Sequence, residues 1–498
     1  MSGLVDPNLH TSSENDAGRS AQEAWEDSPA HPRNWSARRK WTNTLLLAVT
    51  GLLSTTGSSI FVPAAPLLRT EFGISQEVAT LTTSLYVLGL GAGPFVFAPI
   101  SELYGRQRGY IISMIGFTAM NLGCCFVNNL AGLVVLRFLA GFFGSSGPGL
   151  GVATVSDSFE PRERGKPISI YSIGPMLGPV IGSMLGNYLL LIPSSSDPWR
   201  WPFRVLTILV GLNLLAIVFF VRESYAPVCE RKWRAEREAK RKGEGELEKE
   251  ERKVKAEMPK TGQTKEVIVR TFKRPPRMLA NPICCLFATY YAFIYSIIYV
   301  FLVSFPLLYG RHDPPTGAFS YNWPVGTVGL SYVGLGIGML SSAATAASTS
   351  DRIYRHLSER YGNNGEPEYR LVLTQIGMII FPVGLFIWAW TAQAQTHWIG
   401  PVIGGCIFAY GLQLSFNSIQ NFLVDAFFPY SAAAVAAATL LRSILGGVLP
   451  IFSQRLFINL GYGWGGTLLA LVSLPAVPAP LVLFLVGGRL RERWKFKA

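Results

Sequence analysis

Charged residues are scarce in this sequence. Asp, Glu, Lys and Arg make up only 15% of the 498 residues, against about 25% in a typical soluble protein. Long stretches such as 42–59 and 371–396 hold almost none, while hydrophobic residues reach 49% and the mean hydropathy is +0.29. The length alone would suggest about three soluble domains. The composition excludes that arrangement and predicts an integral membrane protein.

Residue types that build catalytic and metal sites are also few. The five histidines are scattered, and the six cysteines form no Cys-x-x-Cys pair that could bind a metal or carry out redox chemistry. Most cysteines fall in apolar stretches, where we interpret them as small packing residues. The glycine-rich stretches 147–151 and 334–338 lie in hydrophobic segments without a following Gly-Lys-Ser/Thr, so neither is a phosphate-binding loop. The sequence therefore predicts no enzyme activity, no metal and no cofactor.

The excess of basic residues is confined to a few segments. The chain has 44 Lys and Arg against 31 Asp and Glu, and 18 of the 44 lie in residues 222–277 beside 11 acidic residues. Most of the others lie in the terminal tails and in short loops. This distribution follows the positive-inside rule of membrane proteins, so we expect a lipid bilayer and no nucleic acid as a partner.

Twelve segments are long and apolar enough to cross a membrane, since a crossing needs about 20 mostly apolar residues. The first six cover residues 42–62, 79–100, 109–128, 131–155, 167–191 and 203–221. The second six cover residues 281–308, 323–347, 371–391, 398–423, 431–454 and 464–487. The sequence thus predicts an all-α membrane protein with twelve transmembrane helices.

The basic residues also orient these segments. If both tails and the even-numbered loops are cytosolic, 37 of the 44 basic residues face the cytosol and five lie outside. The remaining two, Arg137 and Arg442, lie within spans. The chain then divides into a cytosolic tail (1–41, which we expect to be disordered), a six-helix half (42–222), a charged cytosolic loop (223–278), a second six-helix half (279–488) and a short basic cytosolic tail (489–498).

The two halves repeat one another. The segment Asp157-Ser-Phe-Glu-Pro161 after the fourth span matches Asp425-Ala-Phe-Phe-Pro429 after the tenth, 268 positions later, and at the same offset Gly178 aligns with Gly446. Each half therefore looks like one copy of a duplicated six-helix unit. Such repeats place a substrate site near the bilayer midplane, between the halves.

The fifth span carries the most specific motif. Gly174, Gly178, Gly182 and Gly186 are spaced four apart, which puts them on one helical face where another helix can approach closely. Pro179 extends the first three to Gly-x-x-x-Gly-Pro-x-x-Gly. Further motifs are Gly57-x5-Pro63-Ala-Ala-Pro66, Leu133-x3-Arg137-x3-Gly141, Ala98-Pro-Ile-Ser-Glu102-Leu-Tyr-Gly105-Arg106, Arg222-Glu-Ser-Tyr-Ala-Pro227, Pro367-Glu-Tyr-Arg370 and Val424-Asp425.

With these motifs in this order, the chain resembles the major facilitator superfamily, and in particular the fungal branch of its 12-helix drug:proton antiporter family. The resemblance implies two pseudo-symmetric six-helix halves that work by alternating access. It implies efflux of a small amphipathic organic compound (a drug, toxin or secondary metabolite) in exchange for protons. It also implies a role in proton coupling for Arg137, and a charge cluster of Glu102, Arg106 and Asp157 that latches the two halves in the outward-facing state.

Polar side chains inside two spans suggest where the substrate binds. Gln413, Asn417, Gln420 and Asn421 form one stripe of the tenth span, which should face protein or a wet cavity. Tyr291, Tyr295 and Tyr299 are spaced four apart in the seventh span, where they either line the cavity or pack between helices. A cavity of phenols and amides suits neutral amphipathic solutes better than polyamines.

Several alternatives remain open at this stage. No Asp or Glu lies deep in any span, so the residue that carries the proton is not identified. Polyamine export, proton-coupled uptake, and a non-transporting sensor built on a transporter fold are the rival functions. We expect a protein of the plasma membrane, with a vacuolar or vesicular membrane as the alternative, that acts as a monomer.

Overall fold

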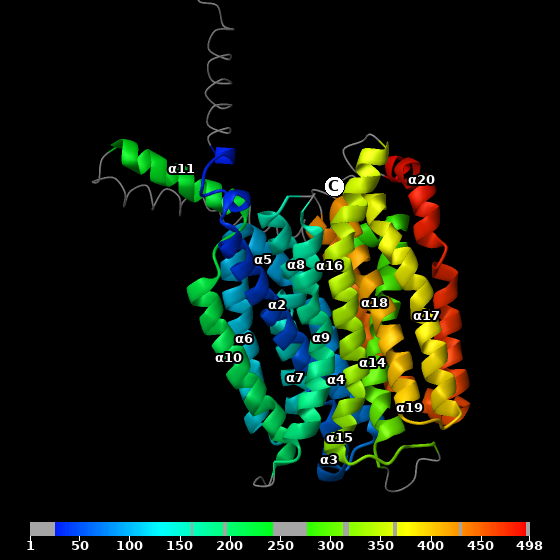
Figure 1. Ribbon diagram of the computed structural model, residues 1–498. Helices are drawn as coiled ribbons and strands as arrows, with labels where there is room; N and C mark the ends of the chain where they lie inside the picture. Colours follow the sequence, from blue (N-terminus) through cyan, green and yellow to red (C-terminus); the bar gives the residue numbers. More distant parts are fainter. Residues whose placement is uncertain are drawn as a thin grey trace, which may run out of the picture.

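The computed structural model describes residues 25–160, 163–192, 197–242, 276–311, 318–361, 366–427 and 431–494. Residues 1–24, most of the predicted charged loop and residues 495–498 lie outside that set, and the disorder expected for the N-terminal tail falls largely on these residues. The described chain is a bundle of long helices, and the two halves of the sequence form its two sides (Figure 1).

The described residues of the N-terminal half form nine α-helices, and a tenth follows in the charged loop. They are α2 (Ala37–Ser59), α3 (Ala65–Phe72), α4 (Gln76–Ala92), α5 (Pro94–Tyr104), α6 (Arg106–Phe126), α7 (Leu130–Gly144), α8 (Ser146–Ser158), α9 (Gly165–Leu189), α10 (Trp201–Phe220) and the polar α11 (Ala226–Lys242). The pairs α4 with α5 and α7 with α8 each form one continuous span.

The C-terminal half is built in the same way. Its helices are α14 (Pro282–Tyr309), α15 (Val325–Val328), α16 (Val333–Tyr361), α17 (Leu371–Gln393), α18 (Ile399–Ala426), α19 (Ser431–Ser473) and α20 (Ala479–Arg493). The packing partners repeat between the halves: α2 packs on α9 as α14 packs on α19, and α4 packs on α7 as α16 packs on α18. The duplication seen in the sequence is therefore a duplication of packing.

Eleven stretches of the described chain are long and apolar enough to cross a membrane, and the last of them is two crossings. Residues Ala433–Arg489 form a stretch of 57 residues, or about 85 Å of helix where about 30 Å spans the hydrocarbon. Gly461 breaks it with φ 74°, a left-handed conformation that favours glycine. Beyond this break, Gly463 lies against Gln393 and Gly487 lies against Glu368, so the chain runs back along α17. The predicted twelve crossings are thus present.

Both ends of the described chain lie at the same end of the bundle, as twelve crossings require. The start of α2, the polar helix α11 and the end of α20 are together at the top of Figure 1, and α3 and α15 lie at the opposite end. A hydrogen bond of 2.7 Å from Asn281 Nδ2 to the carbonyl oxygen of Trp494 ties the end of the chain to the start of α14. We call the end of the bundle that holds both chain ends the terminal end, and the opposite end, with α3 and α15, the distal end.

The glycine string of α9 fixes how the N-terminal half packs. A Cβ atom on Gly174, Gly178 or Gly182 would overlap an oxygen atom of α2, so the two helices approach each other as closely as backbone allows. Thr56 Oγ1 donates a hydrogen bond of 3.1 Å to the carbonyl oxygen of Gly178 across this contact. The glycine face of α9 thus packs against the first span.

Candidate functional site

The tyrosines of α14 lie at the centre of the bundle. Tyr291, Tyr295 and Tyr299 are each at most 2% exposed. The hydroxyl groups of Tyr295 and Tyr299 are 3.1 Å apart, and Ser58 Oγ on α2 is 2.9 Å from Tyr299 Oη. Because Ser58 belongs to the other half, this last hydrogen bond joins the two halves in the interior of the bundle.

The polar stripe of α18 reaches this column through one residue. Gln420 Nε2 donates to Tyr291 Oη at 2.9 Å, and Ser172 Oγ on α9 donates to Gln420 Oε1 at 3.3 Å. Gln413 and Asn417 instead pair with each other at 3.3 Å along the same helix. Asn421 is 2% exposed, and its Oδ1 has no partner in the described chain. The structure therefore brings Gln420 and the tyrosines into one network and leaves the other three stripe residues beside it.

Two fully buried arginines flank the network. The guanidinium of Arg137 on α7 lies 4.4 Å from the ring centroid of Tyr86, and the rings of Phe203 and Phe61 are slightly farther away. Arg137 Nε donates to the Thr82 carbonyl oxygen at 3.4 Å. Both Nη atoms lack a hydrogen-bond partner among the described residues. Aromatic faces thus replace the water that a guanidinium normally binds.

Arg442 on α19 has a similar aromatic cage, formed by rings of the C-terminal half. Its guanidinium lies 4.4 Å from the Tyr295 ring centroid and also faces the rings of Tyr291 and Phe416. Its Nη1 donates to Tyr291 Oη at 3.3 Å. Within the described chain neither Arg442 nor Arg137 forms an ion pair, so two positive charges are buried without a carboxylate beside them.

A cavity of about 450 Å³ opens beside the network at the distal end. It reaches α14 at Val303, one helical turn from Tyr299, and α4 at Thr83. Arg69 and Arg311 are its charged lining residues, and none of the described lining residues is acidic. The remaining lining is Val62, Pro63, Ala65, Pro66, Gln76, Ala79, Thr80, Asn187, Pro306, Leu307, Gly310, Trp323, Val325, Val328 and Gln454.

The terminal end is closed by charged groups that join the two halves. Arg164, just before α9, forms an ion pair with Asp425 at the end of α18. Arg370 bonds the same carboxylate at 3.3 Å and Asp351 on α16 at 3.0 Å. The backbone N–H groups of Gly165 and Lys166 donate to Asp351 at 3.1 and 2.9 Å. We call Arg164, Asp351, Arg370 and Asp425 the inter-half cluster.

The inter-half cluster is nearly sealed from water. The side chains of Arg164, Arg370 and Asp425 are at most 9% exposed. Burial, followed by the neighbouring charge of Arg370, lowers the pKa of Arg164 to about 10, so this arginine stays charged at neutral pH. A buried pair between halves is costly to break because it leaves charge without a partner.

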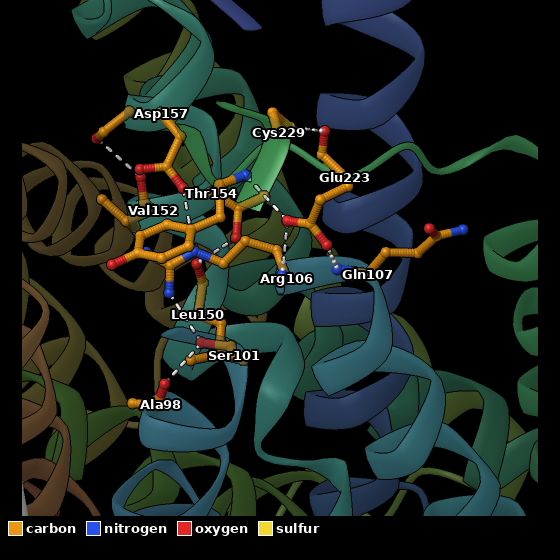
Figure 2. Close-up of polar contacts among 12 residues, drawn as sticks. Ala98, Ser101, Arg106, Gln107, Leu150, Val152, Thr154, Asp157, Glu223 and Cys229 are labelled. Atoms are coloured by element: carbon orange, nitrogen blue, oxygen red, sulfur yellow. Dashed lines mark hydrogen bonds and ion pairs between the residues drawn. The ribbon is translucent and has the colours of Figure 1, made fainter. Parts of the chain in front are cut away.

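A second charged group occupies the equivalent place within the N-terminal half (Figure 2). Arg106 Nε donates to Asp157 at 3.0 Å and its Nη1 donates to Ser101 at 2.8 Å. Glu223 accepts the backbone N–H groups of Arg106 at 2.8 Å and Gln107 at 3.2 Å. We call Arg106, Asp157 and Glu223 the N-terminal cluster.

The N-terminal cluster differs from the expectation in two respects. The resemblance placed Glu102, Arg106 and Asp157 between the halves, but the bonded partners all belong to the N-terminal half. Glu102 acts on Arg106 only through its charge, and it forms no ion pair in the described chain. The contacts that cross between the halves here are those of the inter-half cluster. The physical reason is that Asp157 and Arg106 face each other across α6 and α8 of one half.

Glu223, Arg164 and Asp351 were not among the residues that the sequence predicted for the site. Glu223, Arg370 and Asp425 lie in motifs that were recognised only as family features, Arg222-Glu-Ser-Tyr-Ala-Pro227, Pro367-Glu-Tyr-Arg370 and Val424-Asp425. The two halves use the same arrangement. Arg106 bonds both Ser101 and Asp157, and Arg370 bonds both Ser350 and Asp425. The internal repeat predicts that correspondence at Asp425, 268 positions from Asp157.

A buried polar network between two packed six-helix halves, with a cavity beside it at one end and an ionic cluster between the halves at the other, is the architecture of a secondary transporter. The sequence comparisons give the family. The chain belongs to the Major Facilitator Superfamily, whose family model matches residues 47–450. It is accordingly a membrane transporter and not an enzyme.

Fungal relatives are similar over nearly the whole chain. The efflux pump radE of Floropilus chiversii is 34% identical over 476 residues, which cover 95% of this chain and 84% of that protein. The MFS-type transporter penM of Penicillium rubens is 35% identical, with coverage of 95% and 89%. The MFS-type efflux pump MFS2 of Trichophyton rubrum is 36% identical, with coverage of 94% and 76%. These relatives confirm the family that the motifs predict.

A solved structure of similar fold is that of the proton:xylose symporter XylE bound to 6-bromo-6-deoxy-D-glucose. It superposes with a TM-score of 0.64 and covers 93% of this chain and 100% of that one, at 15% sequence identity. At this identity the likeness concerns the fold alone. The predicted two-half major facilitator fold is confirmed.

Proposed function

We propose that this protein is a proton-coupled exporter of a small amphipathic organic compound, such as a drug, toxin or secondary metabolite. The observation that carries the proposal is the asymmetry of the two ends. A cavity opens at the distal end, and a buried ionic cluster between the halves closes the terminal end. This is the outward-facing arrangement of an alternating-access cycle, with Arg164 and its partners as the gate that separates when the protein opens inward.

The driving force in this proposal is a proton gradient, because the sequence has no ATP-binding motif. We assign the coupling role to Arg137. A charge in the membrane interior costs about 2.5 to 3.5 kcal/mol, and both Nη atoms of this residue lack a partner in the described chain. Such a group responds strongly to any proton or anion that enters or leaves its surroundings. The names of the fungal relatives support export as the direction.

In this proposal the terminal end is cytosolic and the protein works as a monomer in the plasma membrane. The N-terminal cluster then stiffens the cytosolic side of its own half. Substrate enters from the cytosol when the inter-half cluster opens and leaves through the distal cavity. The basic loops at the terminal end support this orientation through the positive-inside rule.

Retention of compounds by cells with and without the protein tests the proposal. The panel contains neutral aromatic compounds, amphipathic acids, amphipathic cations and spermidine, each measured with and without a protonophore. We expect lower retention of amphiphiles, abolished by the protonophore and by Arg137→Ala. Arg108→Gln is the matched control, because this arginine is exposed on α6.

Each alternative has its own result in this assay. A response to spermidine alone would replace the proposal by polyamine export. Accumulation of a compound would indicate uptake. Absence of flux for every compound in vesicles of purified protein would favour a sensor.

A further inference from the structure

Among the described residues, arginines lie along the route from the centre of the bundle to the distal end. Arg442 and Arg137 flank the tyrosine column, and Arg69 and Arg311 line the cavity. Acidic residues of the described chain that form ion pairs lie near the helix ends, as Asp157, Asp351 and Asp425 do. A solute that leaves by this route therefore passes four arginines, and none of the described residues lining the cavity is acidic.

Arg442 is the arginine best placed to hold a ligand. It lies about nine residues, or about 14 Å, inside the span that begins at Ala433, and it is 1% exposed. Its contacts are three aromatic rings and one tyrosine hydroxyl, while its Nε has no partner among the described residues. Cation–π contacts only partly replace hydration. An anion would supply the missing partner.

The hydroxyl group beside Arg442 is set to donate. Tyr291 Oη accepts one hydrogen bond from Gln420 Nε2 and another from Arg442 Nη1. Both partners are donors, so the tyrosine's own O–H proton points to no acceptor within the described chain. A phenol O–H next to a guanidinium is a pair of donors that matches a carboxylate, which only accepts.

The surroundings of this pair suit an aromatic body. Phe416 stacks on Tyr291 with ring centroids 4.5 Å apart, and it also faces Tyr295. On the distal side the lining of the cavity is mostly apolar, with Val303 and Leu307 on α14. A rigid apolar skeleton would contact the rings of Phe416 and Tyr295 while its acidic end reaches Arg442, and it would meet the cavity lining only farther along the route.

We propose that the transported compound is an amphipathic organic acid, whose ionised carboxylate binds Arg442 and the Tyr291 hydroxyl. The inference rests on the proposed export function and names its substrate class. Arg69 and Arg311 then guide the same anion outward through the distal cavity. The Ser58–Tyr299 hydrogen bond, which closes the column in this conformation, has to open for the compound to pass.

Binding of matched ligands to the purified full-length protein tests this inference. The probes share one skeleton: naphthalene-acetic acid, its primary amide and the corresponding amine. Because a hydrogen bond to a charged group contributes about 1.5 to 3 kcal/mol, we expect the acid to bind about 10- to 150-fold more tightly than the amide. Calorimetric titration in nanodiscs measures the three affinities.

Variants separate recognition from folding. Arg442→Gln should bind acid and amide equally, and Arg108→Gln on the surface of α6 should keep the wild-type preference. If Arg442→Gln does not fold, Tyr291→Phe replaces it, because this change keeps the ring and removes only the hydroxyl group; it should reduce the acid preference several-fold. Equal affinities in the wild type, preference for the amine, or an unchanged preference in Arg442→Gln and Tyr291→Phe would overturn the inference.

Flux of the same probes keeps the two proposals distinguishable. Proton-dependent export of the amide, with no preference for the acid, would leave the export function standing and remove the anion site. Selective binding of the acid without any protonophore-sensitive flux would uphold the anion site and overturn the export function.

Discussion

Replacing Arg164 by glutamine would remove the ion pair that crosses between the halves at the terminal end. Arg164 is a better choice than Asp425, since Asp425 keeps Arg370 as a partner at 3.3 Å when Arg164 is lost. Loss of Asp425 would instead take a carboxylate from two buried arginines, of which Arg370 keeps Asp351. Both side chains of the crossing pair are at most 9% exposed, so water does little to weaken it.

The expected size of the effect follows from this burial. A hydrogen bond between charged groups contributes about 1.5 to 3 kcal/mol, and this pair exists only while the terminal end is closed. Arg164→Gln should therefore shift the equilibrium toward the inward-open form by about 10- to 150-fold. The contacts of Gly165 and Lys166 with Asp351 remain, so we expect a shift of populations with the folded state retained.

Pulsed dipolar EPR between the halves would measure this shift. One spin-label pair at Glu160 and Glu359 reports on the terminal end, and another at Thr70 and Thr327 reports on the distal end; all four side chains are exposed. In Arg164→Gln the first distance should lengthen and the second should shorten.

Arg164→Lys keeps the charge, so its two spin-label distances should lie between those of Arg164→Gln and those of the wild type. Unchanged distances at both ends in Arg164→Gln would refute the gate. So would lengthening at both ends, which would indicate loosening of the bundle in place of alternating access.

Three further predictions concern packing and the N-terminal cluster. Gly178→Ala places a Cβ 2.6 Å from the Leu52 carbonyl oxygen, so the melting temperature should fall by the equivalent of about 1 to 3 kcal/mol. Gly211→Ala is the control, because the space around this glycine is open. An equal fall in melting temperature for both variants would contradict the packing argument. Glu223→Ala leaves three backbone N–H groups without their acceptor and should destabilise the protein by about 1 to 3 kcal/mol, whereas Glu223→Gln should cost less in the same thermal assay. Burial, followed by the charge of Glu223, raises the pKa of Cys229 to about 12. At pH 9 only about 0.1% of this cysteine is therefore thiolate, against about 75% of a free cysteine. Peptide-level maleimide labelling of Cys229 should be slow in the folded protein and fast in detergent-denatured protein, and rapid labelling of the folded form would contradict the burial.

The alternation of polar and apolar segments made the fold predictable. Twelve apolar segments, a basic bias between them and a repeat at an offset of 268 positions give a two-half bundle, because lipid requires every spanning segment to satisfy its own backbone as a helix. The boundary between the last two spans was predictable as well, since the expected spans end at residue 454 and begin again at residue 464, on either side of Gly461. The helices before and after it are nearly continuous, and the reversal is recognised from the left-handed glycine and the return of the chain along α17.

The candidate site was predictable only in part. The spacing of Tyr291, Tyr295 and Tyr299 put all three on one face, and they do share a network. The stripe on α18 obeys the same spacing, yet only Gln420 bonds a residue of α14, because a helical period defines a face and not the neighbour that the face meets.

The sequence by itself determined the membrane class, the twelve crossings, the duplicated halves and the family, since each depends on composition, period or local motif. Tertiary structure decided which charges meet. Arg164 and Asp425 are 261 positions apart, and Tyr291 and Arg442 are 151 apart, so no local pattern relates them. Their energies depend on burial and on distances of a few ångströms, and both quantities exist only after the two halves have packed together.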